Sequence, residues 1–220
     1  MKKILFLLIL LPQILSAQLR FLPLPIGTGV SYIDAGAYDP THKGSGVTLS
    51  NGNKTASIVF DGHYNCVLGV VGASSGKKYF EFRQDDPSNM NFGIATIAIN
   101  LNNYLGQSTT GVGYISLTGA VYYNGGFIVT GLGTLTTGDI IGVALDMTNG
   151  AVYFAKNNTW QNGGVPTSGA SMTGAIKTGL TGTWYPVSGT LSGSGTQINT
   201  IRTSAATQTY SPPSGYSPLN

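Results

Sequence analysis

Short runs of alternating apolar and polar residues, separated by Gly, Asn and Asp, extend along most of this chain. Beyond residue 46 no window keeps the 3.6-residue period of an amphipathic helix, whereas several runs repeat every second residue, as half-buried strands do. In the clearest run, Phe80 and Phe82 fall on one face and Glu81 and Arg83 on the other. The pattern predicts strands at residues 47–50, 55–60, 66–71, 78–83, 92–97, 113–116, 120–123, 140–147, 151–155, 184–190 and 197–201. Many short strands joined by turn residues favour an antiparallel sandwich or barrel.

Two segments of the chain resemble each other. Residues 118–124 read Thr-Gly-Ala-Val-Tyr-Tyr-Asn, and residues 149–155 read Asn-Gly-Ala-Val-Tyr-Phe-Ala. Each pattern is typical of the second half of a hairpin that is entered through a Gly turn. Two copies are fewer than a solenoid needs, so we expect two similar hairpins in one domain.

The first 17 residues have the three-part layout of a secretory signal peptide. Two lysines precede an apolar run at residues 4–15, and small residues follow up to Ala17. The run is about 12 residues long and contains Pro12, whereas a membrane-spanning helix needs roughly 20. We therefore expect a signal peptide at residues 1–17 and no spanning segment after its removal. An uncleaved membrane or packing segment is the alternative.

Residues 18–45 are expected to form an extended N-terminal arm ahead of a domain at residues 46–220. Pro23 and Pro25 stand among leucines in this segment, and proline removes a backbone donor and fixes φ. One interpretation is attachment to a larger, multimeric assembly. The other is a plain linker.

Composition and charge narrow the class of protein. Only 9% of the 220 residues are charged and 32 are glycine, yet aromatic and β-branched residues recur, as in a folded all-β extracellular or particle-bound protein. The net charge of +3 falls to +1 without residues 1–17. No dense basic stripe is present, so the sequence indicates no nucleic-acid partner. Cys66, the one cysteine, lies in an apolar run and is expected to be a buried, unreactive thiol.

Several blocks resemble the SPRY domain family in order and spacing, over roughly residues 46–219. They are Lys-Lys-Tyr-Phe-Glu-Phe at 77–82, Phe-Gly-Ile-Ala at 92–95, Leu-Gly at 105–106, Gly-Asp-Ile-Ile-Gly-Val-Ala-Leu-Asp at 138–146, Val-Tyr-Phe-Ala-Lys-Asn at 152–157, Trp-Tyr-Pro-Val at 184–187 and the proline-rich run at 210–219. The resemblance implies an all-β fold, a concanavalin-like two-layer antiparallel sandwich. It also implies a binding module that holds protein segments through loops at one edge, although related sandwiches hold sugars.

The chain departs from the family pattern in its hairpin and loops. Asn157 and Asn158 stand where members often have Asn-Gly, and the loops are unusually rich in Thr, Gly and Ser. This style resembles SPRY-like modules of bacteriophage particles and bacterial surface proteins more than animal ubiquitin-ligase adaptors. The partner residues of those adaptors are therefore not carried over.

Residues suited to catalysis or metal binding are few. His42 and His63 have no clustered partners of the kind a zinc site needs, and both are expected in turns. Residues 85–89, Asp-Asp-Pro-Ser-Asn, lack the spacing of a calcium loop and are expected to cap a strand. Asp139 and Asp146 are expected to be structural, and the remaining acids do not suggest the facing pair of a glycosidase. We expect no enzyme, cofactor or metal.

Residues suited to binding are more numerous. The chain has 12 Tyr and 2 Trp, and these side chains offer rigid contact area with a polar group. The candidate ligand-binding residues are Tyr104, Tyr123, Asn124 and Trp160, each with sandwich packing as the alternative role. The first hypothesis is a non-enzymatic recognition or structural module, secreted or mounted on a virion, that binds protein or host-surface ligands. The second is a secreted lectin-like domain in which Trp160 and Tyr104 stack on sugar rings.

Overall fold

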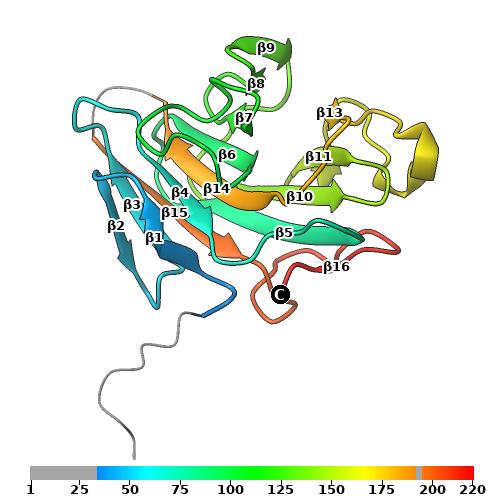
Figure 1. Ribbon diagram of the computed structural model, residues 1–220, viewed down its shortest axis with the longest axis horizontal. Coiled ribbons are helices and arrows are strands. Elements are labelled where there is room, and N and C mark those ends of the chain that lie inside the picture. Colours follow the sequence, from blue (N-terminus) through cyan, green and yellow to red (C-terminus); the bar gives the residue numbers. More distant parts are fainter. Residues whose placement is uncertain (1–33, 192–194) are drawn as a thin grey trace, which may run out of the picture. The chain divides into compact units, whose positions relative to one another are not determined.

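The computed structural model describes residues 34–191 and 195–220; the signal peptide predicted at residues 1–17 and residues 18–33 of the arm predicted at 18–45 lie outside them. Two antiparallel sheets stack face to face (Figure 1). In spatial order, the first sheet contains β1 (Tyr38–Lys43), β4 (Cys66–Gly69), β14 (Tyr185–Thr190), β6 (Met90–Ala95), β7 (Gly111–Ile115), β8 (Ala120–Tyr123) and β9 (Gly126–Val129).

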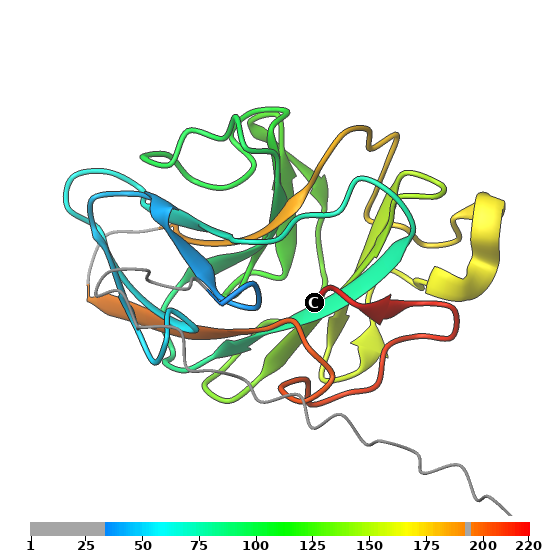
Figure 2. The same ribbon diagram turned by 60° about the horizontal axis from the view of Figure 1, so that its bottom comes forward.

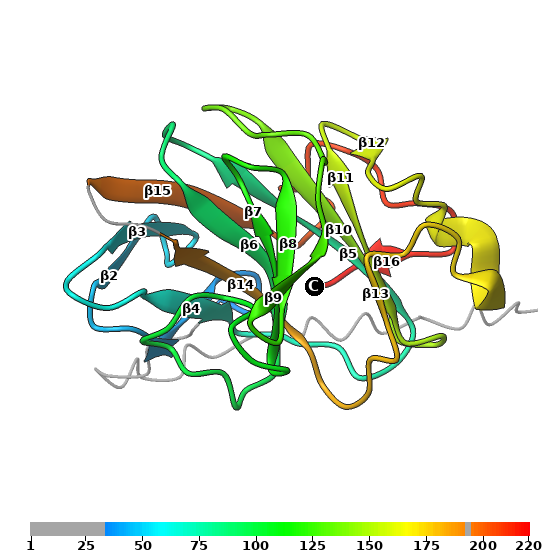
Figure 3. The same ribbon diagram turned by 90° about the horizontal axis from the view of Figure 1, so that it is seen from above.

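The second sheet lies against the first. Its path contains β12 (Thr159–Trp160), β11 (Ala151–Lys156), β10 (Ile140–Asp146), β5 (Lys77–Gln84), β15 (Thr196–Arg202), β3 (Thr55–Val59) and β2 (Val47–Ser50), with β13 (Lys177–Thr178) beside β11 and β16 (Ser217–Pro218) beside β5. Figure 3 shows the two layers, with β6, β7 and β8 in one and β5, β10 and β11 in the other. A short 3-10 helix, η1 (Pro166–Ser171), lies between β12 and β13 in the chain. The predicted all-β two-layer sandwich is confirmed.

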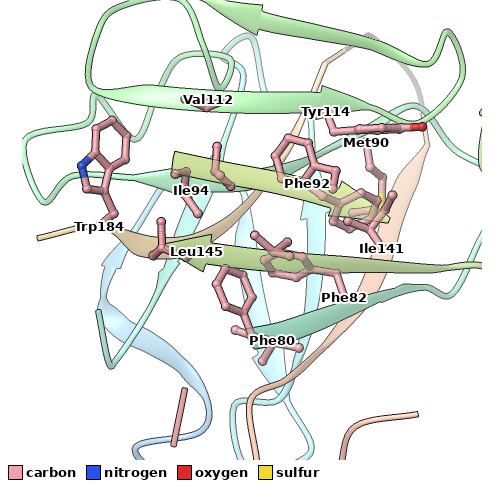
Figure 4. Packing of buried hydrophobic residues seen from close by; sticks show 14 of the residues in the cluster. Phe80, Phe82, Met90, Phe92, Ile94, Val112, Tyr114, Ile141, Leu145 and Trp184 are labelled. Atoms are coloured by element: carbon pink, nitrogen blue, oxygen red, sulfur yellow. The ribbon is translucent and has the colours of Figure 1, made fainter. Parts of the chain in front are cut away.

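The core lies between the inner faces of the two sheets, where large side chains meet (Figure 4). Phe82 of the second sheet and Phe92 of the first have ring centroids 5.4 Å apart, and Tyr114 and Phe154 make an edge-to-face contact at 5.6 Å. Burying each such ring contributes roughly 1.5–3 kcal/mol relative to leaving it exposed. Because these contacts join the sheets without any disulfide, apolar packing is the main force that holds the sandwich together.

Each predicted strand is present, with ends that lie within two residues of the prediction. The two similar segments form hairpins, β7–β8 and β10–β11, and a glycine with positive φ precedes the second strand of each, Gly119 at 61° and Gly150 at 69°. Glycine adopts such angles without the penalty that a Cβ would add. The sequence did not predict β1, β9, β12, β13 and β16.

The strand β1 moves the start of the sandwich ahead of the boundary predicted at residue 46. It pairs with β4, and the fully buried Tyr38 donates its hydroxyl hydrogen to Asn199 Oδ1 in the other sheet. The strand contains Pro40. Proline is tolerated here because β1 is an edge strand with an irregular register.

The C-terminal segment covers the outer face of β5, as Figure 2 shows. Glu81 does alternate with the core phenylalanines, but the segment buries it completely. Its carboxylate accepts hydrogen bonds from the Tyr79 hydroxyl at 3.0 Å and from the backbone N–H groups of Thr209 at 2.7 Å and Tyr210 at 2.8 Å. Three donors compensate the cost of burying this acid, so Glu81 holds the end of the chain against the sheet.

The outer face of the first sheet is covered by the loop between β6 and β7, residues 96–110. Leu105 is fully buried there and belongs to a second apolar cluster with Cys66, Leu68, Ala95 and Val187. The predicted burial of the Cys66 thiol is confirmed, and burial raises the pKa of this thiol to about 12. Within residues 34–191 and 195–220, no helix is long and apolar enough to cross a membrane.

Candidate functional site

The loop at residues 96–110 is fixed by backbone hydrogen bonds at its neck and its middle. Thr96 N–H donates to Thr110 O at 2.9 Å, which closes the neck, and Cys66 N–H donates to Leu101 O at 2.9 Å, which joins the loop to β4. Within the loop, Asn100 Oδ1 accepts a hydrogen bond from Asn102 N–H at 3.0 Å, and Asn103 Oδ1 accepts one from Tyr104 N–H at 2.9 Å. The loop is therefore an ordered part of the sandwich surface.

A cleft of 340 Å³ opens within this loop. We call it the Tyr104 cleft, and it is lined by Ile99, Asn100, Asn103, Tyr104, Gly106, Gln107, Ser108, Thr110 and Gly111. Every residue in the lining is uncharged, and amides, hydroxyls and one aromatic ring predominate. The volume lies at the small end of the range for ligand sites, about 300–1,000 Å³.

Five aromatic side chains form a continuous row that passes the cleft. The successive ring centroids of this aromatic row are 5.3, 5.7, 5.4 and 4.4 Å apart, in the order Phe60, Tyr64, Tyr104, Tyr122 and Phe127. The two ends are exposed, Phe60 by 37% and Phe127 by 58%. Ring pairs at such distances stabilise one another by about 0.5–1.5 kcal/mol, so the row forms a continuous apolar surface.

The turn between β8 and β9 is hydrogen-bonded to two residues that line the cleft. Asn124 N–H donates to Ser108 O at 3.3 Å, and Gly125 N–H donates to Gly106 O at 3.0 Å. Asn124 and Gly125 have φ values of 53° and 77°, which two-residue hairpin turns require and which Asn-Gly supplies. Of the sequence-predicted site residues, Tyr104 therefore lines the cleft, and Asn124 lies beside it, bonded to the lining residue Ser108.

The other two predicted site residues lie elsewhere. Tyr123 lies on the opposite face of β8 from Tyr122 and packs against the main core. Lys177 Nζ lies over the Tyr123 ring, 4.9 Å from its centroid. Trp160 packs on the outer face of the second sheet, with its ring centroid 6.4 Å from that of Tyr79. Trp160 and Tyr104 lie on opposite outer faces of the sandwich, so they do not form one binding surface.

Several residues around the cleft were not among the sequence candidates. Phe60, Tyr64, Tyr122 and Phe127 come from three different segments, and nothing in the local pattern shows that they meet. Asn103 adjoins Tyr104 in the sequence, so a candidate site extended by one residue would have included it. The aromatic pair at residues 122–123 drew attention to Tyr123, whereas it is Tyr122 whose ring contacts Tyr104.

The candidate acids and histidines have structural partners. Asp139 accepts from Thr136 N–H at 2.8 Å, from Asn157 and from Lys156, which agrees with its predicted structural role. His42 lies in β1 rather than in a turn, and its Nδ1 is 2.7 Å from Asp39 Oδ2. Among the residues that the structure describes, no three His, Cys, Asp or Glu side chains are grouped to hold a metal ion.

Comparison with known proteins places this sandwich in a family. The SPRY domain family model matches residues 77–200, more than half of the chain and a range that includes the Tyr104 cleft. The chain belongs to the SPRY domain family. The crystal structure of the SPRY domain of human HERC1 is similar, with a TM-score of 0.63 and 19% sequence identity over 76% of this chain and 97% of that chain. A search of curated proteins found no significant match.

SPRY domains are protein-interaction modules, so the membership identifies this chain as a binding protein of that class. The likeness to the HERC1 domain supports the fold, but at 19% identity it does not assign a functional role to any residue of this chain. In this SPRY chain the aromatic row begins with Phe60 and Tyr64, ahead of the matched range, and continues with Tyr104, Tyr122 and Phe127 inside it.

We predict that Asp146→Asn destabilises the protein by about 1–3 kcal/mol at neutral pH. Burial alone would raise the pKa of Asp146, but hydrogen bonds from Asn149 and from Lys77, 3.0 Å away, outweigh it and lower the pKa from its ordinary 3.8. In the variant, the NH2 group of the asparagine would replace the carboxylate oxygen that accepts from Asn149 and Lys77, so three donors would face one another without an acceptor. Urea unfolding at several pH values measures the effect.

The pH dependence follows from the lowered pKa of Asp146. The contribution of the Asp146 carboxylate to stability is fully present above pH 3.8 and is lost as the pH falls through the folded-state pKa. The stabilities of wild type and Asp146→Asn, plotted against pH, therefore converge in acid. Asp34→Asn, at a partly exposed pair with Lys54, is the control and changes stability by less than about 1 kcal/mol. Equal stability of Asp146→Asn and wild type at pH 7 contradicts the prediction.

Proposed function

We propose that this chain is a non-enzymatic recognition module, secreted or mounted on a virus particle, that holds a protein or host-surface ligand at the Tyr104 cleft. Membership in a family of protein-interaction modules supports the binding role. The position of the cleft supports the location, because it lies in a loop on an outer face of the sandwich, where a partner has access.

The observation that carries the proposal is the continuity of the cleft with the aromatic row. Tyr104 belongs to both, and the exposed rings of Phe60 and Phe127 extend the contact surface on either side. Tyr and other aromatic residues dominate the energetics of binding surfaces because they bury much area and lose little conformational freedom. The backbone beneath is already ordered, which lowers the entropic cost of binding.

The bonding of the acids supports a non-enzymatic role. Asp139 and Asp146 accept several hydrogen bonds each and contact lysines, and Glu81 is enclosed by the C-terminal segment. These carboxylates lie outside the lining of the Tyr104 cleft. A ligand in the cleft would therefore meet amides, hydroxyls and rings, which are groups suited to recognition.

Export is supported by the sequence of residues 1–17, with its basic start, apolar run and small residues before Gln18. The buried state of Cys66 is compatible with an oxidising compartment, because its thiol is enclosed. The part of the predicted arm that precedes the sandwich, residues 18–33, is proposed to attach the domain to a larger assembly.

We predict that Tyr104→Ala weakens binding of the partner at least about tenfold, since the substitution removes the ring shared by the cleft and the aromatic row. Partners are captured on the immobilised full chain from a host-surface extract, identified, and their Kd measured. Tyr210→Ala, a tyrosine on the C-terminal segment, is the matched control and leaves the Kd unchanged. Equal Kd values for wild type and Tyr104→Ala would exclude the cleft as the binding site.

We also predict that the mature protein begins at Gln18. N-terminal sequencing of the protein isolated from its producing cell or particle identifies its first residue. A variant in which a bulky residue replaces Ala17 is the uncleaved control. An intact Met1 on the isolated wild-type protein contradicts cleavage.

A further inference from the structure

We propose that the ligand of the Tyr104 cleft is an uncharged saccharide. The inference rests on the proposed function, because it names the chemical class that the same site recognises. It is carried by the charge, the free hydrogen-bonding groups and the rings of the cleft.

The charge of the lining restricts the ligand first. None of the lining residues carries a charge, and the rings on both sides of Tyr104 are also neutral. A carboxylate, phosphate or ammonium group that entered the cleft would lose water without gaining a counter-ion, which is costly. The cleft therefore favours a neutral ligand.

The free polar groups of the cleft are mostly side-chain amides. Asn100 and Asn103 each use Oδ1 to accept a backbone N–H of the loop, which fixes the amide and leaves its NH2 group without a partner among the described residues. Gln107 is exposed and makes no side-chain hydrogen bond to the part of the chain that the structure describes. An amide can donate to one hydroxyl and accept from its neighbour, so such groups match the vicinal hydroxyls of a sugar ring.

The backbone of the cleft offers less to a peptide. Thr110 O, Gly106 O and Ser108 O already accept hydrogen bonds from Thr96, Gly125 and Asn124. An extended peptide gains affinity mainly from main-chain hydrogen bonds to an open strand edge. Because these three carbonyls are occupied, the side-chain amides of the cleft carry more of its recognition, which favours a ligand that is itself rich in hydroxyls.

The aromatic row supplies the apolar part of the recognition. Tyr104 is half-buried in the cleft wall, Tyr122 lies 5.4 Å from it, and Phe127 stacks on Tyr122 with 58% of its own surface exposed. The C–H face of a sugar ring packs on such surfaces, while the phenol hydroxyls reach its polar edge. A cleft of 340 Å³ suits a short saccharide rather than a long polymer segment.

The test measures binding of the full chain to defined glycans. The probes are neutral oligosaccharides of glucose, galactose, mannose and N-acetylglucosamine, with sialyllactose and a sulfated heparin fragment as charged comparisons. Ligand-observed NMR detects binding and calorimetry gives the Kd. We expect at least one neutral oligosaccharide to bind and the charged glycans to bind at least about tenfold more weakly or not at all.

Three variants locate the binding. Asn103→Asp keeps the Oδ1 acceptor that Tyr104 N–H requires but removes the amide donor and adds a charge, so the loop is retained and affinity falls at least about tenfold. Gln107→Ala removes an exposed amide and weakens binding without affecting folding. Tyr210→Ala, on the C-terminal segment that covers the other sheet, is the control and leaves the Kd unchanged.

The outcomes separate this inference from the proposed function. If no neutral oligosaccharide binds, or if Asn103→Asp and Gln107→Ala bind as wild type does, the saccharide inference is wrong. If a protein partner binds through Tyr104 and saturating oligosaccharide fails to compete, the proposed function stands and the ligand is a peptide surface. If partner binding is also insensitive to Tyr104→Ala, the proposed site is wrong as well.

Discussion

The close approach of the loop at residues 96–110 to a glycine-lined sheet face is the constraint on which the site depends. A Cβ added at Gly113 would lie 2.8 Å from Leu105 Cγ and from Leu105 O, and one at Gly111 would lie 2.6 Å from Leu105 Cδ1. Gly106 has a φ of 92°, and a Cβ there would lie 2.5 Å from Tyr122 O. Side chains at these three positions would push the loop away from the sheet.

The position of the loop determines the chemistry of the surface. With Leu105 held in the apolar cluster, the neighbouring Tyr104 contacts Tyr64 and Tyr122, and the amides of Asn100 and Asn103 line the cleft. The core between the sheets thus provides stability, whereas the packing on the outer face provides the site.

Much of the fold could be predicted from the sequence because the strands that build the core alternate strongly or consist of continuous apolar runs. The strands that were missed have weak local signals. Strand β1 contains Pro40, β9 is short and exposed, and β12, β13 and β16 each have two residues. Glu81 resembles a solvent-exposed strand residue until the C-terminal segment, more than 120 positions further along the chain, covers it.

The candidate site was harder to predict from the sequence than the fold was. Tyr104 was singled out as an aromatic residue in a predicted loop, and Asn124 because it follows Tyr123 and precedes two glycines. The aromatic row, however, joins Phe60 to Phe127 through contacts between segments far apart in sequence, and only the register of the sheets brings them together. Trp160 has the type of side chain that binding surfaces favour, but it packs on the outer face of the second sheet because β12 pairs with β11.

Urea unfolding of Gly113→Ala beside Gly126→Ala tests the central claim most directly. Both glycines lie in strands of the first sheet, but a Cβ at Gly126 would meet nothing within 4 Å. If the loop packs on the glycine face, Gly113→Ala lowers the free energy of unfolding by about 1–3 kcal/mol, while Gly126→Ala leaves it unchanged within about 0.5 kcal/mol. Equal stability of the two variants would contradict the account.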